Sequence, residues 1–378
     1  MINVGIDIGK RFHICAIVTN KGIDRFKILN DKPGVDTLLD KLGNYEKSSV
    51  TVGMEASGHY WYHIYNQLLK NGYQITVINP HITDAVRRMN IRPQKTDRID
   101  SVVIAKTLSI IDTNKETTKP ADDLKVLTRL REDILREKMR LKNRLVATVD
   151  VIFPEYEKVF PNIFTKGSLR LLELTHANPQ KIHKLRINSI RKIINHEDNL
   201  KRSEIIKKFA EETISIGIPI YEYKLGLLLS QLNFISNQLV DIDMAIKIEV
   251  NELGTKIKTI PGISDILAGT ILAETGDIHR FKSYRAYVSF AGLDAIVKQS
   301  GESISGRNSI SKKGSTRLRT SLYRATVTCI GKDNIIDEYF KKKKEEGKHG
   351  KIALVSCSRK LAGIVYAVLK SNTEYIRR

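Results

Sequence analysis

The first hundred residues alternate short apolar runs with turn residues and with longer amphipathic stretches. Five runs rich in isoleucine and valine predict short strands, because each is bounded by turn residues. Apolar residues at helical spacing predict helices from Pro33 to Leu42, from about Tyr60 to Lys70 and from Asp97 to about Ile111. The pattern therefore indicates an α/β unit, whose predicted strands cover residues 2–8, 12–18, 23–29, 49–55 and 73–78.

Two later segments carry leucine and isoleucine at steps of three or four residues among many charged residues. They cover residues 122–149 and 225–253 and predict long amphipathic helices. Two arrangements remain open: the helices fold back as an antiparallel pair in an ordinary bundle, or they join the helices of a partner chain. Between them, residues 153–219 form a basic arm that prolines interrupt, and the sequence does not fix its role.

The chain carries a large excess of positive charge. Among 378 residues, 63 are Lys or Arg and 42 are Asp or Glu, so the formal net charge is +21. Nucleic acid is the expected partner, with a merely basic housekeeping or ribosomal protein as the alternative. Cys15, Cys329 and Cys357 lack the spacing of a zinc site or a disulfide framework. With no signal peptide and no unbroken apolar run of ~18 residues, we expect a soluble cytoplasmic protein.

Four carboxylates lie in three short, well-separated segments of the α/β unit. Asp7 lies on the first predicted strand, Glu55 ends the fourth, and Asp97 and Asp100 lie one helical turn apart near the start of a helix. Two divalent cations about 3.5–4 Å apart clamp a phosphodiester for in-line displacement, and Mg2+ prefers oxygen ligands. The four residues therefore predict a two-metal nucleic-acid site. Each also has a structural reading, as a turn cap or as an acid at a helix N-terminus.

The C-terminal third contains a second concentration of positive charge, between residues 298 and 324. Seven Lys or Arg residues stand against one Glu among Gly and Ser, which favours a strand-and-loop surface along a phosphate backbone over a solvated basic face. Upstream, the IPGI turn at residues 260–263 precedes a predicted helix. The N-terminus of this helix could bind a phosphate through its backbone N–H groups, or the segment could be a plain turn that leads into the helix. We expect phosphate contacts from Lys298, Arg307, Lys312, Lys313, Arg317 and Arg319.

Six sequence motifs occur in the order found in one family of proteins. They are GIDIGK, MEASG, KTDRID, IPGI, AGLDAIVKQSG and ISKKG. The chain resembles the DEDD-type transposases of bacterial insertion sequences, which are bridge-RNA-guided DNA recombinases, over residues 1 to about 370. The resemblance implies an α/β N-terminal ribonuclease H-like (RuvC-like) domain, a long helical coiled-coil middle and a mostly α C-terminal transposase domain with a basic Ser/Gly-rich loop or strand region. We expect these domains at residues 1–115, 116–255 and 256–378.

The resemblance also implies residue roles and partners. Asp7, Glu55, Asp97 and Asp100 would hold metal ions, expected to be two Mg2+. Ser300, in the QSG step, would be the nucleophile that forms a phosphoserine link to DNA; other serines lie nearby, so this role rests on the resemblance alone. The implied partners are donor and target double-stranded DNA, a guide RNA and further copies of the chain in a homodimer or homotetramer, at the nucleoid in the bacterial cytoplasm.

Three other functions compete with this interpretation. A Holliday-junction-resolving nuclease would use the four acids with water as the nucleophile and leave Ser300 idle. A sugar kinase or actin-like ATPase has a loop like GIDIGK, but the sequence lacks a second Asp-Gly phosphate loop. A catalytically dead nucleic-acid-binding protein would not need all four acids. No GxxxxGK[ST] loop occurs, which fits strand exchange without ATP.

Overall fold

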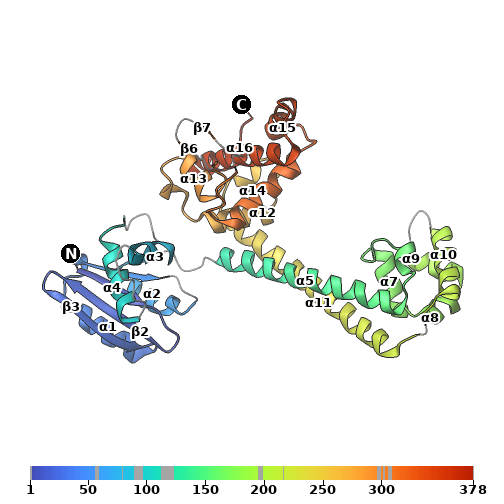
Figure 1. The fold of residues 1–378 in the computed structure, drawn as a ribbon, viewed down its shortest axis with the longest axis horizontal. Coiled ribbons are helices and arrows are strands. Elements are labelled where there is room, and N and C mark those ends of the chain that lie inside the picture. The colour runs from blue at the N-terminus through green and yellow to red at the C-terminus, as the bar shows by residue number, and fades with distance from the viewer. Residues whose placement is uncertain are drawn as a thin grey trace. The chain divides into compact units, whose positions relative to one another are not determined.

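The computed structural model describes residues 2–55, 59–78, 80–88, 97–111, 123–194, 199–215, 217–295, 299–300, 303–304 and 309–377. These residues fall into two compact units, Met1–Asp122 and Asp123–Arg378 (Figure 1). The first unit is built on a sheet, and the second consists mainly of helices.

A mixed five-stranded sheet forms the centre of the first unit. Its strands lie in the order β3-β2-β1-β4-β5; β1, β2 and β3 are joined antiparallel, and β1, β4 and β5 are joined parallel. This order is compatible with a ribonuclease H-like fold. The predicted strands are confirmed to within one residue at each end: β1 (Ile2–Asp7), β2 (Phe12–Thr19), β3 (Gly22–Leu29), β4 (Val50–Glu55) and β5 (Gln74–Ile78).

The two faces of the sheet carry different helices, because side chains alternate along each strand. On one face, α1 (Lys32–Leu42) and α2 (Trp61–Lys70) pack on the buried apolar residues of β1 and β4; a short turn, η1 (Lys47–Ser49), precedes β4. On the opposite face lies α4 (Asp97–Leu108), which contacts β1, β2 and β4. The sequence pattern does not predict the helix α3 (Pro80–Arg88), which follows β5 and packs against α4.

Two glycines allow α4 to lie directly on the sheet. Gly5 of β1 and Gly53 of β4 are partners in the parallel register. A Cβ atom at Gly5 would stand 1.9 Å from the carbonyl oxygen of Ser101 on α4, and one at Gly53 would stand 3.0 Å from the Leu108 side chain. The close approach of helix and sheet therefore requires glycine at residue 5, because only glycine has no Cβ.

An antiparallel pair of long helices, α5 (Asp123–Ile152) and α11 (Pro219–Glu252), runs through the second unit (Figure 1). Arg131 in the first third of α5 pairs with Asp243 in the last third of α11, which fixes their opposite directions. The chain thus realises the first of the two arrangements left open by the sequence; contact with a partner chain stays a prediction. α11 begins six residues before the predicted start, because Pro219 suits the first turn of a helix.

The described residues of the basic arm form five helices at the end of this pair where α5 ends and α11 begins (Figure 1). One apolar core joins the arm to both long helices, through residues such as Leu145 of α5 and Leu228 of α11. The arm is therefore a folded part of the second unit. Its helices are α6 (Tyr156–Val159), α7 (Lys166–Thr175), α8 (Pro179–Lys184), α9 (Ile187–Ile194) and α10 (Asn199–Glu212).

The C-terminal helices form a further core, which also includes Leu124 of α5 and Ile246 of α11. Because both cores share the long helices, the expected boundary at residue 255 stays a prediction. The elements are η2 (Ile257–Thr259), α12 (Asp265–Thr275), η3 (Ile278–Arg280), α13 (Tyr284–Phe290), β6 (Gln299–Ser300), β7 (Ser303–Ile304), α14 (Thr316–Cys329), α15 (Ile335–Glu345) and α16 (Gly350–Ser371).

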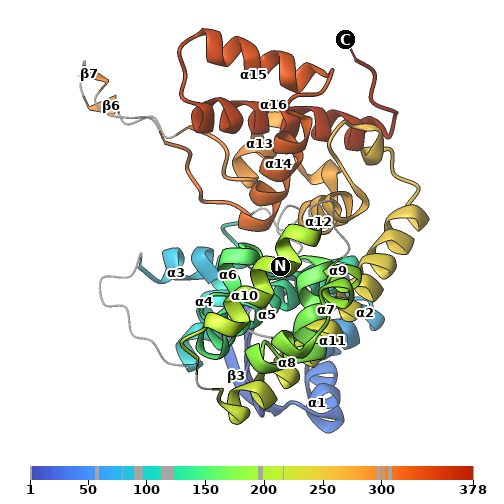
Figure 2. The same cartoon turned by 90° about the vertical axis from the view of Figure 1, so that its right-hand side faces the viewer.

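The last helix, α16, has the length and the apolar composition of a membrane span. It packs against α13, α14 and α15, and Figure 2 shows it between α14 and α15. Its residues Cys357, Leu361 and Val365 are fully buried in the C-terminal core. This burial is the behaviour of the core helix of a globular protein.

Candidate active site

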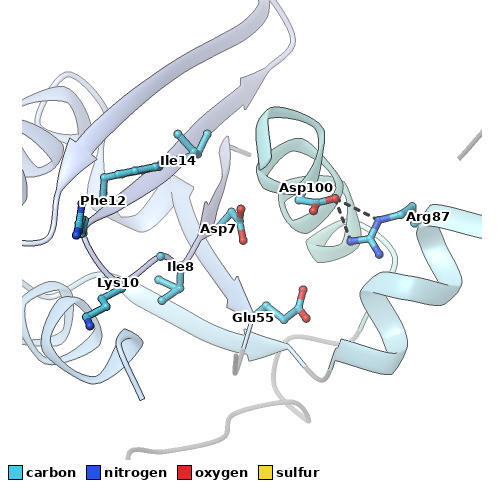
Figure 3. A pocket seen from close by; sticks show the side chains of 10 residues that line it. Asp7, Ile8, Lys10, Phe12, Ile14, Glu55, Arg87 and Asp100 are labelled. Carbon is cyan, nitrogen blue, oxygen red and sulfur yellow. Dashed lines mark hydrogen bonds and ion pairs between the residues drawn. The ribbon is translucent and has the colours of Figure 1, made fainter. Parts of the chain in front are cut away.

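Three of the four predicted carboxylates line one pocket of the first unit. Asp7, Glu55 and Asp100 face a cavity of about 520 Å3 (Figure 3). They come from the end of β1, the end of β4 and the first turn of α4. Asp97 begins α4, but its side chain lies outside the described residues. The remaining lining residues are Ile8, Gly9, Lys10, Arg11, Phe12, Ile14 and Arg87.

The register of the sheet brings Asp7 and Glu55 together. Each lies two residues beyond one of the paired glycines, so both occupy the sheet face that meets α4. The same glycines let α4 approach this face, and Asp100 in the first turn of α4 points into the same space (Figure 3). Strand alternation and one close helix contact therefore assemble a cluster from residues that are distant in the sequence.

The helix α3 contacts two of the three carboxylates. The Thr83 hydroxyl lies 3.2 Å from Oε2 of Glu55 and 2.9 Å from the carbonyl oxygen of Pro80, so it shares its one proton between these two acceptors. One turn later, Arg87 donates from Nη2 and Nε to Oδ1 of Asp100, at 3.0 and 3.2 Å (Figure 3). Only 13% of the Arg87 side chain and 12% of the Asp100 side chain are exposed, so this ion pair is largely buried. Arg87 also pairs with Asp84 on its own helix, at 3.0 Å.

Thr83 and Arg87 are site residues that the sequence interpretation does not include. A local signal for their helix exists, because Pro80 suits a first helical turn, and Asp84, Arg87 and Arg88 follow at three- and four-residue spacing. Their contacts with Glu55 and Asp100 have no such local signal, since they depend on where α3 lies relative to β4 and α4.

Two basic residues stand at the rim of the acidic pocket. Lys10 and Arg11, in the loop between β1 and β2, line the cavity and are exposed. The backbone N–H of Gly9 in the same loop donates to Nδ1 of the buried His13 at 3.3 Å. Burial lowers the pKa of His13, and a hydrogen bond with the Asn30 side chain opposes this shift. Positive side chains at this rim are suited to contacts with the phosphates of a nucleic acid.

The donor chemistry of this pocket fits a hard divalent cation. Its acidic groups are all carboxylates, and hard cations take oxygen ligands. Within the described part of the chain, no three His, Cys, Asp or Glu side chains already lie close enough to form a ligand set for a single ion. Positive charge at Asp100 comes instead from Arg87. The metal-ligand roles of the four acids therefore stay predictions.

The predicted nucleophile lies on a strand of a small two-stranded sheet in the C-terminal part. Ser300 is the second residue of β6, and its backbone position is paired with Ser303 of β7. The side chain of Ser300 lies outside the described residues, as do Lys298 and Arg307. The nucleophilic role of Ser300 and the phosphate contacts of the two basic residues stay predictions.

The four remaining basic residues predicted to contact phosphate differ in their surroundings. Lys312 and Lys313 are exposed. Arg317 is half-buried and forms an ion pair with Glu132 of α5. Arg319 donates to the carbonyl of Ala291 and to the hydroxyl of Thr316, both at 3.2 Å. Among the described residues, neither lysine side chain has an ion-pair partner, whereas the two arginines already contact other parts of the fold.

The turn at residues 260–263 leads into a helix that is already capped by one of its own side chains. The side chain of Ser264 caps α12 by accepting from the backbone N–H of Leu267. Asp265 adds a negative charge in the first turn and pairs with Lys258 at 2.8 Å. A filled cap and an acidic first turn disfavour a phosphate there. The structure thus favours the plain-turn reading of this segment.

Two transposase family models match the parts of the chain that carry these residues. The DEDD transposase model of the IS110 group matches residues 4–154, which include the acidic pocket. The model described as transposase IS116/IS110/IS902 family matches residues 254–341, which include Ser300 and the basic segment.

Several relatives align along most of the chain. The insertion element IS116 uncharacterized 44.8 kDa protein of Streptomyces clavuligerus is 24% identical over 98% of this chain and 94% of its own length. The pilin gene-inverting protein of Moraxella lacunata is 22% identical over 99% of this chain and 98% of its own length. The transposase for insertion sequence element IS1111A of Coxiella burnetii is 28% identical over 50% of this chain and 55% of its own length. Because the two models together cover more than half of the residues, the chain belongs to the IS110/IS116 family of DEDD-type transposases of insertion sequences.

Proposed function

We propose that this transposase cleaves, exchanges and rejoins DNA strands, at the ends of an insertion sequence and at its target, through a phosphoserine intermediate at Ser300. The observation that supports this most strongly is the convergence of Asp7, Glu55 and Asp100 on one pocket, in a chain whose two ends match transposase models (Figure 3). The functional parts are an acidic catalytic domain (residues 1–115), a helical middle with its arm (116–255) and a serine-bearing domain (256–378).

Divalent cations, which we take to be two Mg2+, belong to this proposal. When bound, such ions stabilise the charge on the attacking and leaving oxygens of a phosphodiester. The chain contributes the carboxylates that hold them and the exposed Lys10 and Arg11, which orient the DNA backbone at the same pocket. The residues that would hold the ions are Asp7, Glu55, Asp97 and Asp100.

The covalent step conserves the phosphodiester energy. The Oγ of Ser300 loses its proton and forms a bond to phosphorus, and the bond from phosphorus to one deoxyribose oxygen breaks. That oxygen takes up a proton and leaves as a free strand-end hydroxyl. Rejoining is the reverse reaction with a hydroxyl from the exchanged strand, which restores the serine, so neither ATP nor a redox partner is needed.

The proposed partners are nucleic acids and further copies of the chain. Double-stranded donor and target DNA supply the strands, and a structured non-coding RNA selects them by base pairing in the bacterial cytoplasm. The net charge of +21 supports binding of polyanions in general. The name of the Moraxella lacunata relative describes a protein that inverts a gene. Because inversion of a DNA segment requires recombination at its two ends, this name supports recombination between two sites. A homodimer or homotetramer would bring together the two DNA duplexes.

A Holliday-junction-resolving endonuclease is the second candidate function. It would use the same carboxylates with water as the nucleophile. The mixed sheet with acidic residues at the ends of β1 and β4 favours it as much as the recombinase, because both activities need this pocket. Only the role of Ser300 separates the two.

Covalent capture of DNA tests the proposal. The purified full-length protein is incubated with DNA carrying the ends of its insertion sequence, with RNA transcribed from the flanks of the element, and with Mg2+. After denaturation, labelled DNA that migrates with the protein marks the phosphoserine link. We expect this adduct in the wild type and its loss in Ser300→Ala. Ser309→Ala is the matched control, since Ser309 is exposed in the same segment, and this variant should keep the adduct.

The other outcomes discriminate between the two functions. Mg2+-dependent cutting that persists in Ser300→Ala, without any adduct in the wild type, would establish the resolving nuclease. Loss of both cutting and adduct in Asp7→Asn would support the pocket in either case. An adduct that survives Ser300→Ala would remove this residue from the mechanism.

A further inference from the structure

The helix α3 brackets the acidic pocket with two side chains on one helical face. Thr83 and Arg87 are four residues apart, and they contact Glu55 and Asp100, respectively. Thr83 offers a neutral hydroxyl, whereas Arg87 brings a permanent positive charge into contact with a carboxylate that is largely buried. The second contact therefore neutralises a group that a divalent cation would otherwise neutralise.

Arg87 and a cation would compete for the same atom. Both Nε and Nη2 of Arg87 point at Oδ1 of Asp100 (Figure 3). A carboxylate oxygen that accepts two N–H groups from a guanidinium is a poor ligand, because its lone pairs are occupied and its charge is balanced. Binding of a cation through Oδ1 therefore requires the guanidinium to leave, and a cation at the other oxygen of Asp100 would still be repelled by the positive charge of Arg87.

Asp84 is a second ion-pair partner for Arg87. Nη1 of Arg87 lies 3.0 Å from Oδ1 of Asp84, and the other oxygen of Asp84 is held by Arg88 at 2.7 Å. The Asp84 side chain is 42% exposed, so it remains solvated when it is paired with either arginine. The Arg87 guanidinium can thus release Asp100 and still keep an ion pair on its own helix.

We propose that Arg87 is a positioning residue that stands in for a divalent cation at Asp100 and withdraws toward Asp84 when the cation binds. Before a cation binds, Arg87 balances the negative charge of the Asp100 carboxylate and keeps it pointed into the pocket. The same contact weakens cation binding, so the acidic pocket takes its metal only when binding is favourable enough to open the ion pair. The inference rests on the proposed role of Asp100 as a metal ligand.

Manganese binding to the full-length protein tests this competition, because free Mn2+ is measured directly by electron paramagnetic resonance without any turnover. We expect Arg87→Gln to bind Mn2+ about tenfold more tightly than the wild type, because the ion no longer has to displace the guanidinium. A tenfold change in affinity corresponds to ~1.4 kcal/mol in the free energy of binding. Arg88→Gln is the matched control: it makes the same change one residue away, removes a partner of Asp84 and does not contact Asp100. Its Mn2+ affinity should equal that of the wild type.

A second readout is the unfolding temperature with and without Mn2+. Arg87→Gln should unfold at a lower temperature than the wild type in chelator and gain more from added Mn2+, because it leaves Asp100 unpaired until the ion binds. Arg87→Lys keeps the charge but loses the forked geometry, so its affinity should lie between those of Arg87→Gln and the wild type. This variant also serves if Arg87→Gln does not fold.

The measurements distinguish failure of this inference from failure of the proposed metal site. Suppose that Asp100→Asn lowers the Mn2+ affinity, but Arg87→Gln and Arg87→Lys bind Mn2+ no more tightly than the wild type. Arg87 would then only stabilise the fold, and this inference would be wrong. If neither the wild type nor Arg87→Gln binds Mn2+, or if Asp100→Asn leaves the affinity unchanged, then the proposed metal role of Asp100 fails.

Discussion

Gly5 of β1 and Gly53 of β4 are register partners beneath α4, each two residues before a carboxylate of the pocket. This pairing couples the packing of a helix to the assembly of an acidic site. A side chain at Gly5 would push α4 away and carry Asp100 with it.

Substitution of Gly5 is expected to destabilise the first unit strongly. Its added Cβ would meet backbone atoms, the Ser101 carbonyl oxygen at 1.9 Å and the Ala105 nitrogen at 2.5 Å, which cannot rotate away. We expect Gly5→Ala to lower the free energy of unfolding by about 3 kcal/mol, the upper end for overpacking. At Gly53 the nearest atoms belong to the Leu108 side chain, so Gly53→Ala should cost about 1 kcal/mol.

Chemical denaturation measures both effects. The control is Gly43→Ala at the end of α1, where the backbone is in the right-handed helical region and the nearest contact of a Cβ is 3.3 Å away. This variant should unfold at the same denaturant concentration as the wild type or slightly above it. Equal stabilities for Gly5→Ala and Gly43→Ala would show that α4 does not lie directly on the sheet.

The strands of the first unit could be predicted because each is a local pattern. Runs of β-branched residues between turn residues mark β1 to β5, and the side-chain period of two places Asp7 and Glu55 on one face once the register is known. The register itself is a tertiary property. The sequence suggests that Asp7, Glu55 and Asp100 belong together through their residue type, their places on predicted strands and a helix, and a resemblance to a family, but it does not show how they meet.

The contacts of α3 could not be predicted for a related reason. Nine residues with a mostly polar composition give a weak helical signal beside a Pro that ends a strand. The partners of Thr83 and Arg87 lie on β4 and α4, so no spacing rule connects them. Likewise, Arg317 is one of several basic residues in the sequence, and only the fold reveals Glu132 beside it.

Acidification should destabilise the first unit through His13. Burial lowers the pKa of this residue from 6.5, so between 6.5 and the lower folded value the unfolded chain binds more protons than the folded one. The stability that depends on neutral His13 is therefore fully present above pH 6.5 and is lost as the pH falls through the folded pKa. His13 alone changes the free energy of unfolding by at most about 1.4 kcal/mol per pH unit.

Thermal unfolding of His13→Leu between pH 5 and pH 7 checks the expectation. This variant should show a flatter pH dependence than the wild type, whatever its absolute stability. His63→Leu is the control, since His63 is exposed on α2, and it should keep the wild-type dependence. An unchanged pH dependence in His13→Leu would mean that another group governs the acid response.

The exposed lysines of the basic segment are expected to contribute directly to DNA affinity. Each phosphate contact adds about 0.9 to the slope of log affinity against log salt, because a bound counterion is released. We expect Lys313→Gln to flatten this slope by about one unit. Arg317→Gln should change the slope less and lower the unfolding temperature, because Arg317 is already paired with Glu132. Equal slopes for Lys313→Gln and the wild type in a fluorescence-anisotropy titration would place Lys313 outside the interface.

Self-association is expected through the outer face of α11. Leu227, Phe234 and Ile248 follow at multiples of seven residues and are at least half exposed, so they form a stripe that α5 does not cover. The stripe is apolar except for Asp241, at the step between Phe234 and Ile248. The double variant Leu227→Glu/Phe234→Glu should convert the proposed dimer or tetramer into a 42.9 kDa monomer, as measured by light scattering. Leu174→Glu, at an exposed position of the arm, is the control and should leave the mass unchanged. A wild type that is itself monomeric at micromolar concentration, or a double variant of unchanged mass, would show that this stripe does not hold copies of the chain together.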